Sequence, residues 1–379
     1  MDITLINYLP FVPLIILGLA LLIQVYFLLF VYTKLALYKV RDLDKGIART
    51  PPLSVVICAR NEEVNLKDNL ELVLNQDYPD YEVVVVNDCS FDDSEWVLKE
   101  FSEKYPQLKV VSLKEDVRFK HGKKFAVTMG IKAAKNEQMV FTDADCRPAS
   151  VHWLRNIGSA FDKERKIVLG YSPYTKYPGF LNYFIRFETF HTALSYLSHA
   201  LKRNPYMGVG RNLAYTKSLF FEGKGFASHM HILSGDDDLF VNQNGNRYNT
   251  NICIHPDAHV WSEPKRDWAS YSVQKARHHG ASEAYKGKHK WMLSLQVGSA
   301  VTFYMFLILS FILYTAWWPY LLGAYFLRLI IQLLVYSPCM KKLQVGDLLL
   351  SLPIMDIFFY FYTSFNGFFS LLRKDVRWK

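Results

Sequence analysis

Asp143 and Asp145, two aspartates separated by one residue, are the side chains of this chain best suited to bind a metal ion. They follow the apolar run Gln138–Thr142, which is typical of a buried strand that ends at the carboxyl edge of a sheet. Two carboxylates at such an edge can converge on one hard cation, which then takes its other oxygen ligands from phosphate groups. On spacing alone a solvated Asp-x-Asp turn is the commoner interpretation, so the surrounding residues must decide.

A second acidic cluster, Asp236-Asp237-Asp238, lies further along the chain. Crowded carboxylates raise one another's pKa, which suits one of them to accept a proton near neutral pH. The alternative is the acidic first turn of a helix, where such residues interact favourably with the helix dipole.

Strands and helices alternate in the part of the chain that must position these residues. Continuous apolar strands with intervening helices predict an α/β domain whose parallel sheet is covered on both faces. Ligands of such sheets bind beyond the carboxyl ends of the strands. Three polar clusters fall at these ends: Arg60-Asn61-Glu62, Asn87-Asp88 and Asp143-Ala144-Asp145. The expected strands are Leu53–Ala59, Glu82–Asn87, Leu108–Ser112 and Gln138–Thr142, and the expected helices are 64–75, 92–105 and 123–134.

Apolar segments long enough to span a membrane flank this domain. The first, Tyr8–Tyr32, carries no charged side chain and exceeds the ~20 residues that a transmembrane helix needs. We therefore expect a transmembrane helix over 1–34, a basic linker over 35–50 and the α/β domain over 51–285. A transmembrane region over 290–372 and a basic tail over 373–379 complete the chain. The three C-terminal apolar segments are Leu293–Tyr314, Trp317–Tyr336 and Leu348–Leu372, with breaks predicted at Trp317–Pro319 and Pro338–Lys342.

The charge distribution predicts which side of the membrane the domain occupies. Basic residues follow the first span, at Lys34, Lys39, Arg41, Lys45 and Arg49, so the positive-inside rule places the domain in the cytoplasm of a multi-pass plasma (inner) membrane protein. The net charge of +9 then faces anionic membrane lipids, and the basic residues form no aromatic-interleaved face for nucleic acid. Three C-terminal spans would put the basic tail outside, against the rule. Either Leu348–Leu372 is re-entrant around Pro353 and Asp356, or the rule fails here.

A series of motifs occurs in order between residues 51 and 280. They are Ser54–Glu63, Asn75–Pro79, Glu82–Ser90, His121–Lys124, Thr142–Asp145, Gly210–Tyr215, Gly235–Leu239 and Gln274–His278. Their residues and spacing resemble those of membrane-bound family 2 glycosyltransferases, in the branch that contains hyaluronan and cellulose synthases and their non-processive relatives. The resemblance implies the Rossmann-like GT-A fold and a nucleotide-diphosphate sugar as donor. One departure is Cys89, which stands where the family usually has glycine.

The resemblance also implies a role for each motif residue. It assigns Asp145 to direct contact with Mg²⁺ or Mn²⁺, and Asp143 to the metal or the ribose. For the catalytic base, counting back from Leu239 favours Asp236, whereas counting forward from Gly235 favours Asp237. The remaining substrate-binding residues are Arg60, Glu62 and Asp88 on the nucleotide, Lys123 and Lys124 at a helix start suited to phosphate, Asn212, and Gln274 with Arg277 near the diphosphate and acceptor.

The expected function is inverting, metal-dependent transfer of a sugar, with UDP as the expected nucleotide, to a lipid-linked or membrane-proximal glycan acceptor in cell-envelope synthesis. The first alternative is a processive polysaccharide synthase. His278 in place of the family's tryptophan and the few C-terminal spans argue against it. The second alternative is an inactive membrane scaffold that binds nucleotide-sugar, and the intact carboxylates argue against that one.

Seven apolar side chains between Phe180 and Leu201 fall on one helical stripe. Core packing is the usual interpretation of such a stripe. Beside membrane spans, an interfacial helix over 180–201 that lies at the lipid headgroups is equally consistent with it.

Overall fold

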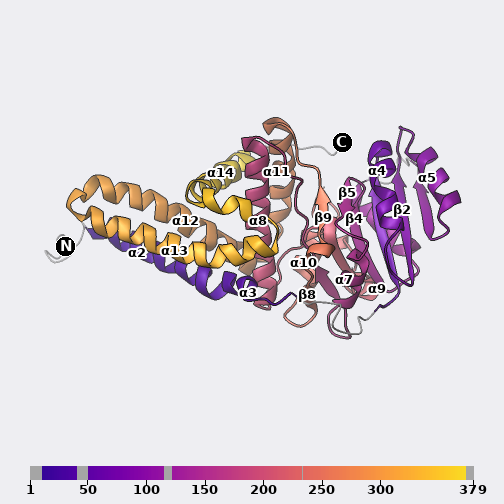
Figure 1. Ribbon diagram of the computed structural model, residues 1–379, viewed down its shortest axis with the longest axis horizontal. Helices are drawn as coiled ribbons and strands as arrows, with labels where there is room; N and C mark the ends of the chain where they lie inside the picture. Colours follow the sequence, from indigo (N-terminus) through magenta and orange to yellow (C-terminus); the bar gives the residue numbers. More distant parts are fainter. Residues whose placement is uncertain (1–10, 41–49, 115–121, 233, 373–379) are drawn as a thin grey trace. The chain divides into compact units, whose positions relative to one another are not determined.

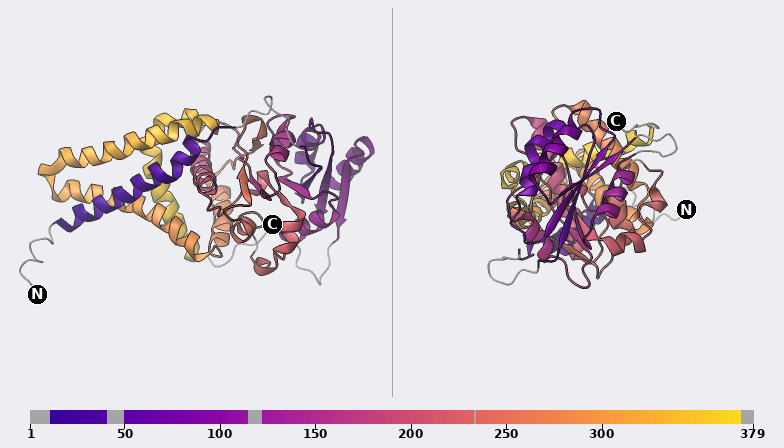
Figure 2. Two further views of the ribbon diagram at one scale, coloured as in Figure 1. Left: turned by 90° about the horizontal axis from the view of Figure 1, so that it is seen from below. Right: turned by 90° about the vertical axis from the view of Figure 1, so that its right-hand side faces the viewer.

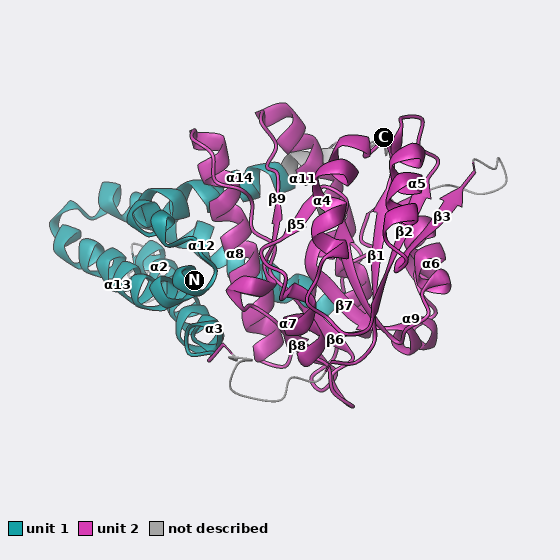
Figure 3. Cartoon of the chain, turned by 45° about the vertical axis from the view of Figure 1, so that its right-hand side comes forward, with its two compact units in different colours: residues 1–38, 286–374 teal, residues 39–285, 375–379 magenta. Residues whose placement is uncertain are grey.

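The computed structural model describes residues 11–40, 50–114, 122–232 and 234–372. The chain divides into two compact units, one built from residues 39–285 and the other from 1–38 and 286–374 (Figure 3). Several residues singled out in the sequence lie outside the described part: Arg41, Lys45, Arg49, His121 and the tail 373–379.

A mixed seven-stranded sheet forms the centre of the 39–285 unit (Figures 1 and 3). Its strand order is β3-β2-β1-β4-β7-β6-β8. The first four strands are parallel, as the alternation of strands and helices predicts. β7 runs antiparallel to β4 and β6, which the sequence pattern did not reveal. The strands are β1 (Leu53–Ala59), β2 (Tyr81–Asp88), β3 (Leu108–Leu113), β4 (Gln138–Asp143), β6 (Ile167–Leu169), β7 (Leu213–Thr216) and β8 (Thr250–Ile252), and a second sheet pairs β5 (Cys146–Pro148) with β9 (Val260–Ser262).

Helices cover both faces of this sheet because side chains alternate along each strand. Val55 and Ile57 of β1 face a core that includes Leu66, Leu70 and other residues of the helices on one side. Helix α6 lies on the opposite face. A Cβ on its Gly130 would come 2.6 Å from a methyl group of Val56, so glycine lets this helix approach the sheet closely.

The helices of this unit begin and end near their predicted limits where limits were predicted. They are α4 (Glu63–Leu74), α5 (Ser94–Lys104), α6 (Lys123–Ala133), α7 (Trp153–Ser159), α8 (Phe180–Leu201), α9 (Lys217–Glu222), α10 (Asp238–Asn244) and α11 (Trp268–Ser282), with 3₁₀ turns at η4 (Gly210–Asn212), η5 (Ala227–His229) and η6 (Pro256–Ala258).

The stripe on α8 is buried in the structure. Phe184, Phe187, Phe190 and Leu194 have no exposed surface, whereas Phe180 at the start of the helix is 54% exposed. Phe184 packs on the rings of residues in α11, with a ring-centre distance of 6.1 Å to Tyr271. Core packing therefore accounts for most of the stripe, and the interfacial role of 180–201 stays a prediction.

The second unit is helical. Its elements are α2 (Val12–Tyr26), the π-helical η2 (Phe27–Tyr32), α3 (Thr33–Ala36), α12 (Gly287–Leu313), η7 (Thr315–Trp317), α13 (Trp318–Lys342), η8 (Gly346–Ser351) and α14 (Leu352–Leu372). α2 lies alongside α12 and α13 (Figures 1 and 2). Within the described ranges, four helical segments are long and apolar enough to cross a membrane: Val12–Ala36, Gly287–Leu313, Thr315–Lys342 and Gly346–Gly367.

The predicted break at Pro338 is wrong, because α13 continues through this proline to Lys342. α14 is continuous from Leu352 and contains Asp356. Pro353 is its second residue, in the first turn, where the missing N–H of proline leaves no helical hydrogen bond unmade.

Candidate active site

The carboxyl ends of β1, β2 and β4 lie side by side at one edge of the sheet. In the strand register Cys58 of β1 is opposite Asp143 of β4, and Ala59 is opposite Asn87 of β2. The polar clusters that follow these strands are therefore brought together, as predicted from the positions of the strand ends.

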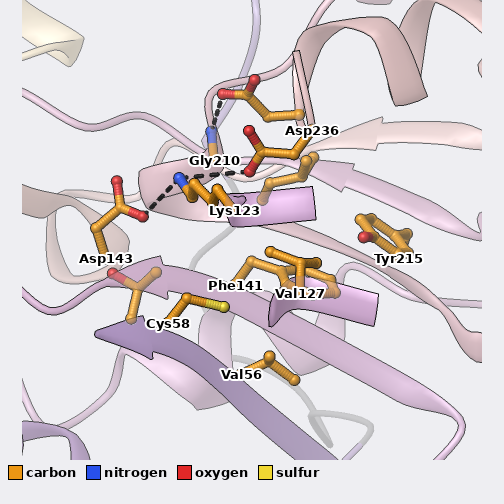
Figure 4. Close-up of a pocket in the computed structure, with 12 residues that line it drawn as sticks. Val56, Cys58, Lys123, Val127, Phe141, Asp143, Gly210, Tyr215 and Asp236 are labelled. Atoms are coloured by element: carbon orange, nitrogen blue, oxygen red, sulfur yellow. Dashed lines mark hydrogen bonds and ion pairs between the residues drawn. The ribbon is translucent and has the colours of Figure 1, made fainter. Parts of the chain in front are cut away.

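Lys123 joins two acidic groups that are distant in the sequence (Figure 4). It is the first residue of α6, and its Nζ lies 2.9 Å from Oδ1 of Asp143 and 3.3 Å from Oδ2 of Asp236. The ammonium group thus bridges a carboxylate of the predicted metal site and a carboxylate of the predicted catalytic cluster. The pocket around it is lined by Val56, Cys58, Lys123, Val127, Phe141, Thr142, Asp143, Gly210, Leu213, Tyr215, Asp236 and Asp237.

Electrostatics keep both members of the Lys123–Asp143 pair charged. Burial acts to lower the pKa of Lys123, but the surrounding aspartates, Asp143 first, outweigh it and raise that pKa well above its ordinary value. Burial acts to raise the pKa of Asp143. There the Lys123 ammonium, with smaller contributions from Arg211 and Arg277, lowers the pKa below its ordinary value.

Asp143, Asp145 and Cys146 can offer ligand atoms that lie within 4.8 Å of one another. Burial raises the pKa of the Cys146 thiol well above its ordinary value, so the thiol stays neutral and donates to Oδ1 of Asp145 at 3.2 Å. Burial, followed by repulsion from Asp143, raises the pKa of Asp145. A divalent cation would relieve this repulsion, and two carboxylates fit a hard cation such as Mg²⁺ or Mn²⁺.

Asp236 and Asp237 both line the pocket but have different partners. Oδ2 of Asp237 accepts a hydrogen bond of 2.6 Å from the backbone N–H of Gly210, and Oδ1 accepts one of 2.8 Å from the N–H of Asp238, which caps α10. The carboxylate of Asp236 instead faces the Lys123 ammonium. Among the described residues, no backbone N–H donates to Asp236, which suits its carboxylate to accept a proton from a substrate.

Asp238, the third aspartate, begins α10 and is buried. Its Oδ2 accepts a hydrogen bond of 2.8 Å from the hydroxyl of Tyr285, and its Oδ1 accepts one of 2.7 Å from the N–H of Leu239. Burial, followed by repulsion from Asp237, raises the pKa of Asp238 to about 7.

The residues predicted to hold the nucleotide lie at the same edge of the sheet. Arg60 and Glu62 follow β1 and are partly buried, and Asp88 ends β2 with only 3% of its surface exposed. Burial raises the pKa of Glu62, and Asp145 adds to the rise, so these two carboxylates are close enough to repel each other.

The turn after β1 is held by the loop that follows β2. Asn61 does not cap α4: it has a φ of 56°, and its Oδ1 accepts a hydrogen bond of 2.8 Å from the N–H of Phe91. The N–H groups of Glu62 and Glu63 are instead bound by Ser94 and Asp92, so the loop after β2 caps α4. Cys89 in that loop has a φ of 54°, a conformation that glycine adopts more easily.

Lys124 and Asn212 do not line the pocket. Nζ of Lys124 donates to the carbonyl oxygens of His229 and Ile232 at 2.6 and 2.9 Å, and burial lowers its pKa to about 8. The side chain of Asn212 has no exposed surface; it donates to two backbone carbonyls and accepts from the indole N–H of Trp153. Both residues adjoin residues that line the pocket, Lys123 in one case and Leu213 in the other, and their contact with substrate stays a prediction.

Helix α11 contributes the remaining predicted residues. Nε2 of Gln274 lies 3.4 Å from the hydroxyl of Tyr174, and the backbone carbonyl of Arg277 accepts from Ser234 at 2.8 Å. The effect of the Arg277 charge on Asp143 indicates that α11 lies close to the pocket. The side chain of His278 lies outside the described part of the chain.

Sequence reasoning missed Arg211, the residue between Gly210 and Asn212. Its guanidinium carbon lies 4.3 Å from the ring centre of Tyr174, and its charge acts on Asp143 and Asp145. The available signal was an arginine within an otherwise uncharged motif directly before a strand.

The mixed sheet of this topology, with a paired-aspartate turn and a second acidic cluster across one pocket, has the features expected of the GT-A fold. Residues 54–223 match the model of the family described as Glycosyl transferase family 2, and the chain carries a domain of this family.

Comparisons with known proteins agree with this assignment. The chain is 27% identical over 250 residues to "Probable glycosyltransferase YdaM" of Bacillus subtilis, covering 62% of this chain and 56% of the relative. It is 32% identical over 93 residues to a poly-beta-1,6-N-acetyl-D-glucosamine synthase of Staphylococcus epidermidis, covering 24% of this chain and 21% of that protein. The chain thus spans little more than half the length of the first relative and about a fifth of the second.

A solved structure shares the fold. The mannosyltransferase PcManGT of Pyrobaculum calidifontis, solved with GDP-Man and Mn²⁺, superposes with a TM-score of 0.55 at 18% sequence identity. The match covers 89% of this chain and 98% of that one.

Proposed function

We propose that this chain is an inverting, metal-dependent glycosyltransferase. It moves a sugar from a nucleotide-diphosphate donor to a lipid-linked or membrane-proximal acceptor in cell-envelope glycan synthesis. The observation that carries the proposal is the meeting of Asp143, Lys123 and Asp236 in one pocket, with Asp145 beside it.

The residues divide the chemistry between them. Asp145 and Asp143 would hold Mg²⁺ or Mn²⁺, which when bound supplies a Lewis acid for the charge that develops on the leaving diphosphate. The Lys123 ammonium adds a positive charge at the start of α6, where helix N–H groups also favour anions. Asp236 takes the proton from the acceptor hydroxyl. The oxygen of that hydroxyl bonds to the anomeric carbon as the nucleoside diphosphate leaves it.

The donor and the cellular setting belong to the proposal as well. UDP-sugars are the first donors to test, and GDP-mannose joins them because PcManGT was solved with it. The four apolar helices support a multi-pass protein of the plasma (inner) membrane, and the basic residues after the first span favour a cytoplasmic catalytic domain.

Transfer by detergent-purified full chain tests the proposal. A panel of UDP- and GDP-sugars is incubated with membrane lipid extract, with Mn²⁺, with Mg²⁺ or with chelator, and release of nucleoside diphosphate is measured. We expect one donor to be consumed in a metal-dependent reaction. Asp145→Asn and Asp236→Asn should each reduce the rate by about 10²–10⁴-fold, the contribution expected of a general base or of a preorganised electrostatic contact.

Asp80→Asn is the matched control, because the Asp80 side chain is 58% exposed and lies on the surface. It should retain the wild-type rate. Binding of a donor by the wild type without release of nucleoside diphosphate would favour the inactive scaffold, and no binding of any donor would refute the site itself.

A further inference from the structure

The backbone around Arg211 is fixed, and the charge of Arg211 acts on Asp143 and Asp145, the carboxylates proposed to bind the metal ion. On one side of Arg211, the N–H of Gly210 donates to Asp237, and a Cβ on Gly210 would lie 3.1 Å from Oδ2 of that aspartate. On the other side, Asn212 is fully buried and hydrogen-bonded. The backbone of the η4 turn is therefore anchored at both neighbours of Arg211, so its side chain starts from a defined position.

The hydrogen-bond donors of the Arg211 guanidinium are only partly used within the described part of the chain. Nη2 donates to the carbonyl oxygen of Ser172 at 3.3 Å, and the flat group lies over the Tyr174 ring at 4.3 Å. Nη1 is shielded from solvent and has no hydrogen-bond partner among the described residues. A buried donor without an acceptor is destabilising, whereas an anionic ligand would satisfy it.

The surroundings indicate which anion this is. Arg211 acts electrostatically on Asp143 and Asp145, the residues that would hold the metal ion and, through it, phosphate oxygens. Tyr174, on which Arg211 stacks, is also the partner of Gln274 in α11. A planar guanidinium matches the geometry of phosphate, to which it can donate two parallel hydrogen bonds.

We infer that Arg211 binds a phosphate group of a substrate, with its guanidinium oriented by the Tyr174 ring. The inference rests on the proposed function and deepens it. The phosphate belongs either to the diphosphate of the donor or to a lipid-linked acceptor, because both carry the chemistry that Arg211 recognises.

Binding measurements on the full chain distinguish the two sources. Affinities for UDP and GDP in the presence of Mn²⁺, and for a polyprenyl phosphate in detergent micelles, are measured for wild type, Arg211→Gln and Arg211→Lys. Loss of a bidentate, charge-assisted contact should weaken binding of the relevant ligand by about 10–100-fold in Arg211→Gln. Arg211→Lys keeps the positive charge but loses the paired N–H donors of the guanidinium, so it should weaken binding of that ligand by a smaller factor.

Arg147→Gln is the matched control. This arginine follows Cys146 in the chain, but its side chain is 43% exposed and pairs with Glu263 on the surface. It should bind every ligand as the wild type does. Thermal melting of each variant shows whether it folds. If Arg211→Gln does not fold, the affinities of Arg211→Lys test the inference.

Each outcome has one meaning. Weaker nucleotide binding assigns Arg211 to the donor, and weaker polyprenyl phosphate binding with unchanged nucleotide affinity assigns it to the acceptor. Wild-type affinity for all three ligands in both Arg211 variants overturns this inference alone. A wild-type protein that binds no nucleotide overturns the proposed function as well.

Discussion

Three consecutive aspartates at positions 236–238 acquire different chemistry from their partners. Asp237 is engaged by two backbone N–H groups, and Asp238 by a tyrosine hydroxyl and one N–H. Asp236 faces the Lys123 ammonium, which a substrate phosphate could bind in its place. Hydrogen bonds from fixed donors stabilise a carboxylate in place, whereas a base must be free to approach a substrate hydroxyl.

Substitution of the first two aspartates separates these roles. Asp236→Asn should reduce sugar transfer by about 10²–10⁴-fold while leaving the thermal midpoint close to that of the wild type. Asp237→Ala should instead destabilise the protein by about 0.5–2 kcal/mol, because α10 loses its cap. Transfer rates and thermal melts of both variants check this. An active Asp236→Asn beside a folded but inactive Asp237→Ala would make Asp237 the base.

The sequence identifies candidate residues more readily than it separates their roles. Asp143, Asp145 and Asp236 stand out as candidates because they lie in motifs at strand ends or in an acidic cluster. The choice between Asp236 and Asp237 could not be made, because the hydrogen bond that engages Asp237 comes from Gly210, 27 residues earlier. Arg211 was missed for a similar reason: its stacking on Tyr174 is a tertiary contact, and its electrostatic effect on Asp145 depends on the folded arrangement.

At the scale of elements, long β-branched strands were predictable and short ones were not. The run Val83–Val86, whose four side chains are all buried, predicts a strand that is covered on both faces. β7 has four residues, and its antiparallel direction is set by pairing with β4 and β6. Local pattern carries no information about such pairing, so the mixed sheet could not be deduced.

The start of α10 should make the stability of the protein depend on pH. The pKa of Asp238 is about 7 in the folded protein and has an ordinary value of 3.8, so the folded state binds an additional proton between these values. The resulting stabilisation is fully present below about pH 4 and is lost as the pH rises through 7. Asp238→Asn mimics the protonated side chain and removes this dependence.

Thermal melts at pH 5 and pH 8 test this prediction. The midpoint of the wild type should fall between the two pH values by at least ~2 °C more than that of Asp238→Asn. Asp80→Asn, on the surface, should behave as the wild type does. Equal falls in wild type and Asp238→Asn would show that Asp238 does not titrate in this range.

At the scale of the whole molecule, the chain combines a sheet unit that carries the pocket with a helical unit held by a buried polar network. Arg328 of α13 and Asp356 of α14 pair at 2.9 Å, and almost no surface of either side chain is exposed. Gln24 of α2 accepts from Arg328, and Tyr304 of α12 donates to Asp356. One network thus connects four apolar helices. The sequence shows Arg328 and Asp356 only as single charges within apolar segments and does not show that they pair, since helix pairing is a tertiary property.

This network predicts that removing one charge is worse than removing both. Arg328→Met leaves the Asp356 carboxylate buried without its cation, and Asp356→Leu leaves the guanidinium without its anion. Each should destabilise the helical unit by about 3–5 kcal/mol. The double variant leaves no buried charge in this network and should recover much of this loss, since apolar side chains of similar volume often replace a buried ion pair without penalty.

Thermal unfolding of the full chain in detergent measures the effect, with Lys341→Met as the control because Lys341 is exposed. A double variant no more stable than either single one would mean that the hydrogen bonds to Gln24, Tyr304 and Gln332, rather than the charge balance, hold these helices together.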